Sequence, residues 1–87
     1  MSLFVAKRMV RRKDGSYRIY YELRANIWEK ERGAVRQVYA GYLGSKPVIS
    51  EAKAERLAAQ ISQRLGRPIT VEDLRRVKKL RIVPDAP

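Results

Sequence analysis

The stretch Tyr17–Trp28, YRIYYELRANIW, decides the fold, because its alternate positions differ in chemistry. Successive side chains of a β-strand point to opposite faces of the sheet. One set of positions is apolar or aromatic: Tyr17, Ile19, Tyr21, Leu23, Ala25 and Ile27. The other set mixes arginines, an acid, an amide and two aromatic rings: Arg18, Tyr20, Glu22, Arg24, Asn26 and Trp28. The pattern predicts a strand whose first face packs on a core. Its second face carries a mixture of arginines and aromatic rings that is unusual for a face exposed only to solvent.

A tight turn at Lys13–Ser16 joins this strand to a first strand, Leu3–Arg12. A two-residue loop would place arginines of the first strand on the core side. A three-residue loop with Gly15 in the bulge position instead forms apolar cross-strand pairs, Met9 with Ile19 and Val5 with Leu23. We predict this second register, because it buries apolar groups. It puts three residues of the first strand on the same outer face as three of the second: Arg8, Val10 and Arg12 with Arg18, Tyr20 and Arg24.

A third strand is predicted over Val35–Leu43, after a charged turn at Glu29–Gly33. Our assignment puts Val35, Tyr39 and Leu43 on the inner face and Arg36, Val38 and Tyr42 on the outer face. This register leaves Gln37 on the inner face, whereas the opposite register would suit Val38 and Ala40. Gly41 and Gly44 indicate a bulge or the close approach of another segment.

Two helices are predicted after a linker over 45–49. The first covers 50–65, with Ser50 as N-cap and Gly66 as the stop, and packs on the inner face of the sheet. The second covers 70–81, with Thr70 and Asp73 in a capping box and Leu74, Val77 and Leu80 as anchors. Ile82 and Val83 could form a short extended piece before a tail over 84–87. We therefore expect a single α+β domain over 1–87: a three-stranded antiparallel sheet over 1–44, one long helix and a shorter basic helix.

The net charge is +11, from 20 lysines and arginines against 9 acids. Such an excess attracts polyanions, of which nucleic acid is the usual partner and an acidic protein or anionic membrane the alternative. The chain has no cysteine and no histidine, which excludes disulfides and removes the commonest zinc, nucleophile and acid–base chemistry. Neither a signal peptide nor a membrane span is recognisable. We expect a cytoplasmic protein that is not an enzyme, that uses no metal or cofactor and that has no membrane partner.

Arginines bind phosphates and guanine edges, and aromatic rings stack on bases. The predicted nucleic-acid-binding residues lie on the outer sheet face and in the basic second helix: Arg8, Arg12, Arg18, Tyr20, Arg24, Trp28, Arg36, Gln37, Tyr42, Arg75, Lys78 and Lys79. The same residue types also suit the solvent side of an antiparallel sheet, and basic residues late in a helix offset its negative end.

Three short segments resemble the N-terminal region of DDE-type transposases of bacterial insertion sequences: YRIYYEL over 17–23, GAVRQ over 33–37 and YLGS over 42–45, followed by the helix ISEAKAERLAAQI. The resemblance covers about residues 3–65. It implies a β-sheet module that contacts DNA, with Tyr20, Arg36 and Gln37 as contacts. It does not extend to the catalytic domain or its acidic triad, so DNA cleavage is not implied.

The sequence thus predicts a small nucleic-acid-binding protein, with DNA ahead of RNA. An RNA- or ribosome-associated binder and a module that docks an acidic partner are the alternatives. An exposed strand edge would also allow homodimers by sheet extension.

Overall fold

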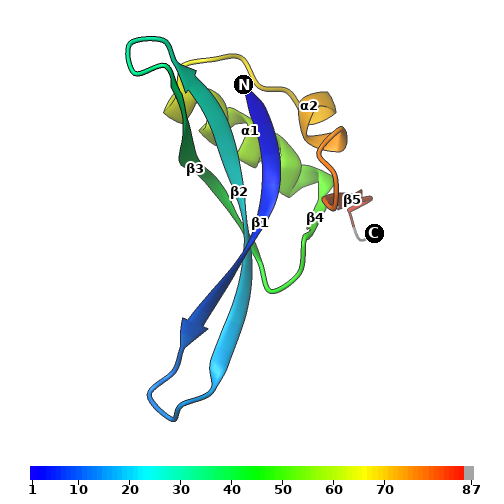
Figure 1. The fold of residues 1–87 in the computed structure, drawn as a ribbon. Coiled ribbons are helices and arrows are strands. Elements are labelled where there is room, and N and C mark those ends of the chain that lie inside the picture. Colours follow the sequence, from blue (N-terminus) through cyan, green and yellow to red (C-terminus); the bar gives the residue numbers. More distant parts are fainter. Residues whose placement is uncertain (86–87) are drawn as a thin grey trace.

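The first three strands form one antiparallel sheet in the order β1-β2-β3, as the sequence predicts, and helix α1 packs against it (Figure 1). The computed structural model describes residues 1–85, so the end of the predicted tail lies outside the described residues. The elements are β1 (Ser2–Arg11), β2 (Tyr17–Glu29), β3 (Ala34–Gly44), β4 (Val48–Ser50), α1 (Glu51–Leu65), α2 (Val71–Arg75) and β5 (Arg81–Val83). The α+β class is confirmed.

The β1–β2 hairpin has the predicted register, with Val5 opposite Leu23 and Met9 opposite Ile19. The amide of Arg12 donates to the carbonyl of Ser16 at 2.7 Å, which encloses a three-residue loop. Gly15 lies in this loop with a φ of +89°, a conformation that glycine adopts without a steric penalty. The local turn chemistry therefore sets the pairing of the whole hairpin.

The predicted register of the third strand is wrong in its first half. Val35 and Tyr39 pair with Trp28 and Arg24 and so share the outer face, whereas Arg36 and Val38 pair with Ile27 and Ala25 of the inner-facing set. Gln37 lies opposite Asn26 on the outer face, rather than on the inner face. The cause is the register shift between Gly41 and Tyr39, at which Ala40 is the extra residue; a second shift makes Leu43 an extra residue. Leu43 is buried and Tyr42 faces outward, as predicted.

The position of Gly41 beside these bulges has a steric reason. A Cβ atom built on Gly41 would overlap the side chain of Leu57 in α1, so only glycine lets the helix approach β3 this closely. Leu57 belongs to the buried face of α1 together with Ala54, Ala58 and Ile61. The helix has the predicted ends. The Ser50 hydroxyl accepts from the Lys53 amide, and Gly66 closes the helix in the left-handed conformation.

The second helix is shorter than the predicted 70–81. The capping box of Thr70 and Asp73 is present, but α2 ends at Arg75. Leu74 is buried within α2, and the chain continues in turns that bury Val77 and Leu80 before it enters β5. The predicted linker contains a strand that the sequence does not reveal, since β4 pairs in parallel with β5. The residues paired with Val48–Ser50, Arg81–Val83, are extended and so do not continue the second helix.

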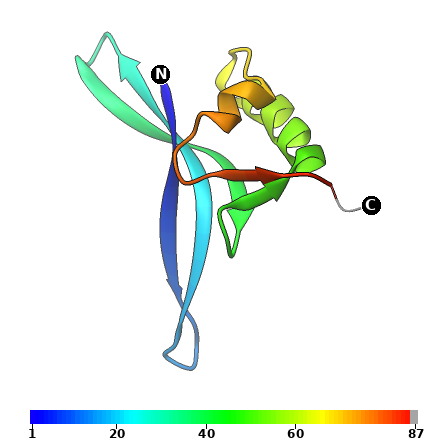
Figure 2. The same cartoon turned by 90° about the vertical axis from the view of Figure 1, so that its right-hand side faces the viewer.

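The β1–β2 hairpin reaches well beyond the part of the sheet that α1 and α2 cover (Figures 1 and 2). We call its outer part, Lys7–Ile19, the arm. Every residue of the arm is exposed. The inner face of the sheet is therefore covered by the core only outside the arm, where Leu23 and Ala25 are fully buried.

Candidate nucleic-acid interface

The arm concentrates unpaired positive charge. It carries six cationic side chains and one acid, Asp14: the cations are Lys7, Arg8, Arg11, Arg12, Lys13 and Arg18. Within residues 1–85 none of these six cations forms an ion pair. Asp14 instead accepts from the amide and hydroxyl of Ser16, and these hydrogen bonds lower the pKa of its carboxyl. The arm is thus a two-stranded ribbon with cations on both faces and no charge partner of its own.

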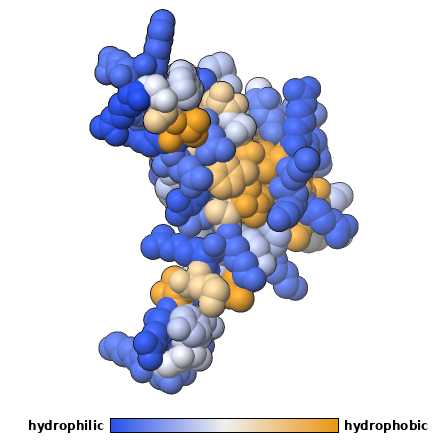
Figure 3. Space-filling view, in the orientation of Figure 1, coloured by the Kyte–Doolittle hydropathy of each residue, from blue (hydrophilic) through white to orange (hydrophobic). Residues whose placement is uncertain are grey.

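Apolar side chains are exposed on the arm as well. Met9 and Tyr17 are each 59% exposed, and Val10 and Ile19 are also open to solvent. Figure 3 shows apolar atoms partway along the arm, between its hydrophilic tip and the body. The sequence predicts that Met9, Tyr17 and Ile19 face a core. Their face is correct, but no core reaches them, because α1 and α2 pack only against the other end of the sheet.

Tyrosines and basic side chains lie next to one another on the outer face of the body. The Tyr20 and Tyr42 rings have centroids 5.9 Å apart and are tilted by 57°. The guanidinium of Arg18 lies over the Tyr20 ring at 4.8 Å, and Arg8 is the cross-strand neighbour of Tyr20. The predicted residues Arg8, Arg18, Tyr20 and Tyr42 are therefore adjacent, at the point where the arm joins the body.

Arg24 differs from the other predicted arginines of the first two strands because it has a partner. Its Nη2 lies 3.4 Å from Oε1 of Glu22, a residue that is only 4% exposed. The second carboxylate oxygen of Glu22 is buried without a hydrogen-bond partner. Arg24 therefore compensates a buried negative charge, which makes it a structural residue first and a candidate phosphate contact second.

The remaining predicted residues of the sheet lie near the opposite end of β2. Trp28 is 61% exposed and opposite Val35, and Gln37 lies on the same face. Arg36 lies on the other face, where its Nε bonds to Oε1 of Glu29 at 2.6 Å. Trp28 and Gln37 thus extend the outer face away from the arm, whereas Arg36 does not belong to it.

The predicted basic cluster at the C-terminal end is divided. Arg75 bonds to Glu51 at 3.0 Å and to Glu72 at 3.4 Å, and so ties α2 to the start of α1. Lys78 and Lys79 are exposed, and neither forms an ion pair within the described chain. These lysines follow α2 in turns rather than lying on a helix face, and Lys79 has a φ of +70°.

A groove between β3 and α1 contains, besides the predicted Tyr42, side chains that the sequence does not single out. Tyr39, Tyr42 and Gly41 line it on the sheet side, and the helix contributes Lys53, Arg56, Leu57, Gln60 and Arg64. Helical spacing assigns the polar residues among them only to the solvent side of α1. Their proximity to the two tyrosines depends on how α1 packs across β3, for which the sequence carries no local signal.

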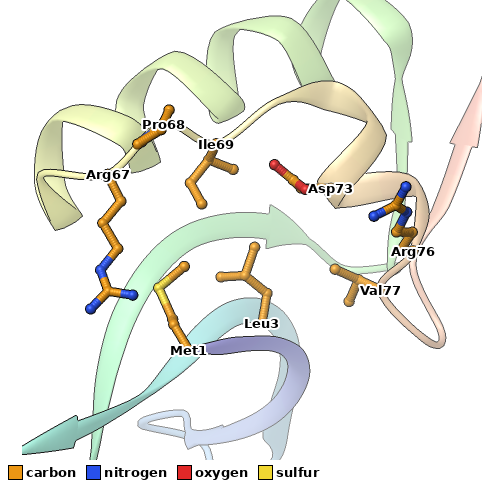
Figure 4. Close-up of a pocket in the computed structure, with 8 residues that line it drawn as sticks. All are labelled: Met1, Leu3, Arg67, Pro68, Ile69, Asp73, Arg76 and Val77. Carbon is orange, nitrogen blue, oxygen red and sulfur yellow. The ribbon is translucent and has the colours of Figure 1, made fainter.

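A second surface pocket lies elsewhere, between the N-terminus of β1 and the segment that leads into α2 (Figure 4). Its volume is about 490 Å³. The lining is mostly apolar, with two arginines and one acid: Met1, Leu3, Arg67, Pro68, Ile69, Asp73, Arg76 and Val77. Hydrogen bonds from the Thr70 amide and hydroxyl hold the Asp73 carboxylate and lower its pKa. The Asp73 carboxylate therefore already has hydrogen-bond partners within the capping box.

Among residues 1–85, no three acidic side chains lie close enough together to hold a metal ion. In the same range, no helix combines the length and apolar composition that crossing a membrane requires. No family model, curated protein or solved structure matches the chain.

Proposed function

We propose that this protein binds duplex DNA without acting on it chemically, using the arm and the adjoining outer sheet face. The observation that carries the proposal is the arm itself, an exposed two-stranded ribbon with six cations that have no ion-pair partner in residues 1–85. Folding normally pairs or disperses like charges, because their mutual repulsion opposes compaction. Cations gathered on an arm outside the core are better explained by an anionic ligand than by stability.

The dimensions of the arm fit a DNA groove. Its first strand pairs over Lys7–Arg11, which at about 3.3 Å per residue gives roughly 17 Å of ribbon. The major groove of B-DNA is about 12 Å wide and admits a two-stranded β-ribbon. A ribbon in that groove would bring Arg8, Arg12 and Arg18 to phosphates or guanine edges. Tyr20 would lie where the arm meets the body.

DNA is favoured over duplex RNA by the same geometry. The major groove of A-form RNA is deep and narrow, so side chains on a ribbon do not reach into it. The resemblance to the N-terminal region of DDE-type transposases points in the same direction. It supports contacts by Tyr20 and Gln37, which lie on the outer face, more than one by Arg36, which bonds to Glu29 on the other face.

The test is fluorescence anisotropy with a labelled DNA duplex, measured across a salt series. Each phosphate that the protein neutralises contributes about −0.9 to the slope of log K against log salt concentration. We expect the arm variant Arg8→Ala/Arg12→Ala/Arg18→Ala to bind more weakly, with a slope shallower by about 0.9 for each phosphate that it no longer neutralises. The matched control is Lys30→Ala/Lys46→Ala/Arg67→Ala, which removes the same charge from exposed positions outside the arm.

Equal weakening by the arm and control variants would contradict the proposal, because it would mean that the charge acts diffusely. Binding that does not change between low and moderate salt would contradict it too. A duplex RNA of the same sequence is the third ligand. Tighter binding to that RNA than to DNA would favour the RNA-associated alternative.

A second candidate function, docking of an acidic protein segment, is favoured by the pocket of Figure 4. Its apolar lining would hold one apolar side chain, and Arg67 and Arg76 beside it would attract carboxylates. If this were the principal activity, excess duplex DNA would not compete with the acidic partner. Competition by DNA would favour the arm as the functional surface.

A further inference from the structure

The groove between β3 and α1 is chemically distinct from the arm, but Tyr42, which lines it, lies beside Tyr20 where the arm joins the body. It is about 300 Å³ in volume, and none of the residues that line it is acidic. The arm presents cations on an open ribbon, whereas the groove combines aromatic rings with cations in a concave site. A ligand that binds both surfaces must therefore contain two different structures, one that fits the open ribbon and one that fits the concave aromatic site.

The tyrosines of the groove are supported by cations of the helix. The guanidinium of Arg64 lies over the Tyr39 ring at 5.0 Å, and the ammonium of Lys53 lies 5.7 Å from the centre of the Tyr42 ring. These two cations also bond to the backbone of β3. Arg64 donates to the Ala40 carbonyl and Lys53 to the Leu43 carbonyl, each at 3.1 Å.

Because of these bonds, the rings and cations are held in place before any ligand arrives. Tyr39 and Tyr42 are 43% and 49% exposed, so each ring keeps an open surface. Both anchored cations have donors to spare, since a lysine carries three N–H donors and an arginine five. Arg56 also lines the groove, and it forms no ion pair within the described residues.

We propose that this groove binds a short run of unpaired nucleotides, so that the protein engages a junction between duplex and single-stranded DNA. Bases would stack on Tyr39 and Tyr42, and phosphates would lie against Lys53 and Arg56. Sites for single-stranded nucleic acid combine such aromatic platforms with a positively charged groove. The Gln60 amide, which also lines the groove, offers a donor and an acceptor to a base edge.

A duplex does not fit this site. Its bases are paired and stacked on one another, and the double helix is too wide to enter a groove of about 300 Å³. The duplex surface is instead the arm, and this inference rests on the proposed DNA-binding function for that half of the junction. Unpaired nucleotides leaving the duplex would pass from the arm to the groove by way of Tyr42, which lines the groove and lies beside Tyr20 where the arm joins the body.

The experiment compares a blunt DNA duplex with the same duplex carrying a short single-stranded extension at either end, again by fluorescence anisotropy. We expect the preferred extension to tighten binding about tenfold, since stacking of even one base on an aromatic ring is worth about that factor. Arg56→Ala should remove most of this gain and leave blunt-duplex affinity unchanged, and Tyr39→Leu should also remove most of the gain. Arg67→Ala, which deletes the same charge outside the groove, should keep the gain.

Each outcome decides one proposal. Equal affinity for blunt and extended duplexes would overturn the groove proposal and leave the arm proposal standing. Loss of the gain in Arg67→Ala as well as in Arg56→Ala would also overturn it, because position in the groove would then not matter. Failure of the wild-type protein to bind the blunt duplex at low salt is the separate result that contradicts the arm proposal.

Discussion

Glu22 lies buried on a sheet face whose neighbouring side chains are mainly tyrosine and arginine. Ala6 and Tyr42 are its cross-strand neighbours, and Arg24 is the cation that it contacts. A buried carboxylate without its cation keeps the full penalty of leaving water. From the sequence, Arg24 is simply another arginine of the outer face. The structure gives it a role in stability that Arg18, on the same strand, does not share.

We therefore expect Arg24→Ala to reduce the free energy of unfolding by about 1–3 kcal/mol, because it leaves Glu22 buried and unpaired. Arg18→Ala should change it by less than about 0.5 kcal/mol, as is usual for an exposed side chain. Urea denaturation followed by circular dichroism measures both. The double variant Glu22→Gln/Arg24→Ala should recover part of the loss. An Arg24→Ala protein as stable as the wild type would show that the pair is not needed.

At the scale of elements, the β1–β2 hairpin is one ribbon with two different environments. The inner-facing set of β2 continues from the body into the arm through Ile19 and Tyr17, but only the part near the body is covered by α1 and α2. Leu23 is fully buried, whereas Met9 on the same face is 59% exposed. Apolar residues of the arm thus contribute little to the core and remain available to a ligand.

The hairpin gives a prediction that compares two substitutions on one face. Leu23→Ala should reduce the free energy of unfolding by about 2–5 kcal/mol, because it leaves a cavity in the core. Met9→Thr should change it by less than about 0.5 kcal/mol, since its side chain is mostly in solvent. Thermal and urea unfolding of the two variants test this difference. A large loss in Met9→Thr would mean that the arm packs against something in solution.

At the scale of the whole molecule, the uneven balance of charge acts against the stability of the folded state. Among the acids, Glu22, Glu29, Glu51 and Glu72 are paired with arginines, while the six cations of the arm are not paired within residues 1–85. Much of the net charge of +11 is therefore left uncompensated on the surface. Such an excess destabilises the compact state by self-repulsion, and salt screens that repulsion.

Salt should consequently have opposite effects on folding and on binding. We expect the melting temperature of the free protein to rise between about 50 and 200 mM salt, as screening weakens the repulsion, while affinity for duplex DNA falls over the same range. Differential scanning fluorimetry and anisotropy in matched buffers measure the two quantities. The triple arm variant should show a smaller rise. A melting temperature that falls with salt would mean that attractive ion pairs dominate instead.

Several features were determined by the sequence alone because they depend on neighbouring residues. Alternation over Tyr17–Trp28 fixed the two faces of β2, and Gly15 in its turn fixed the hairpin register. Ser50 and Gly66 fixed the ends of α1. The arginines and tyrosines where the arm joins the body were predictable for the same reason, since most of them belong to one hairpin.

Other features were decided only by the tertiary structure. The faces of β3 depend on bulges beside Gly41, where Leu57 of a later helix approaches the strand. After the early end of α2, the chain pairs β5 with β4, which lies far away in the sequence. The groove forms because packing of α1 across β3 places Arg64 over the Tyr39 ring. The arm is exposed because the helices do not pack against it. These outcomes follow from contacts between distant segments, and such contacts leave no periodic signal in the residues that make them.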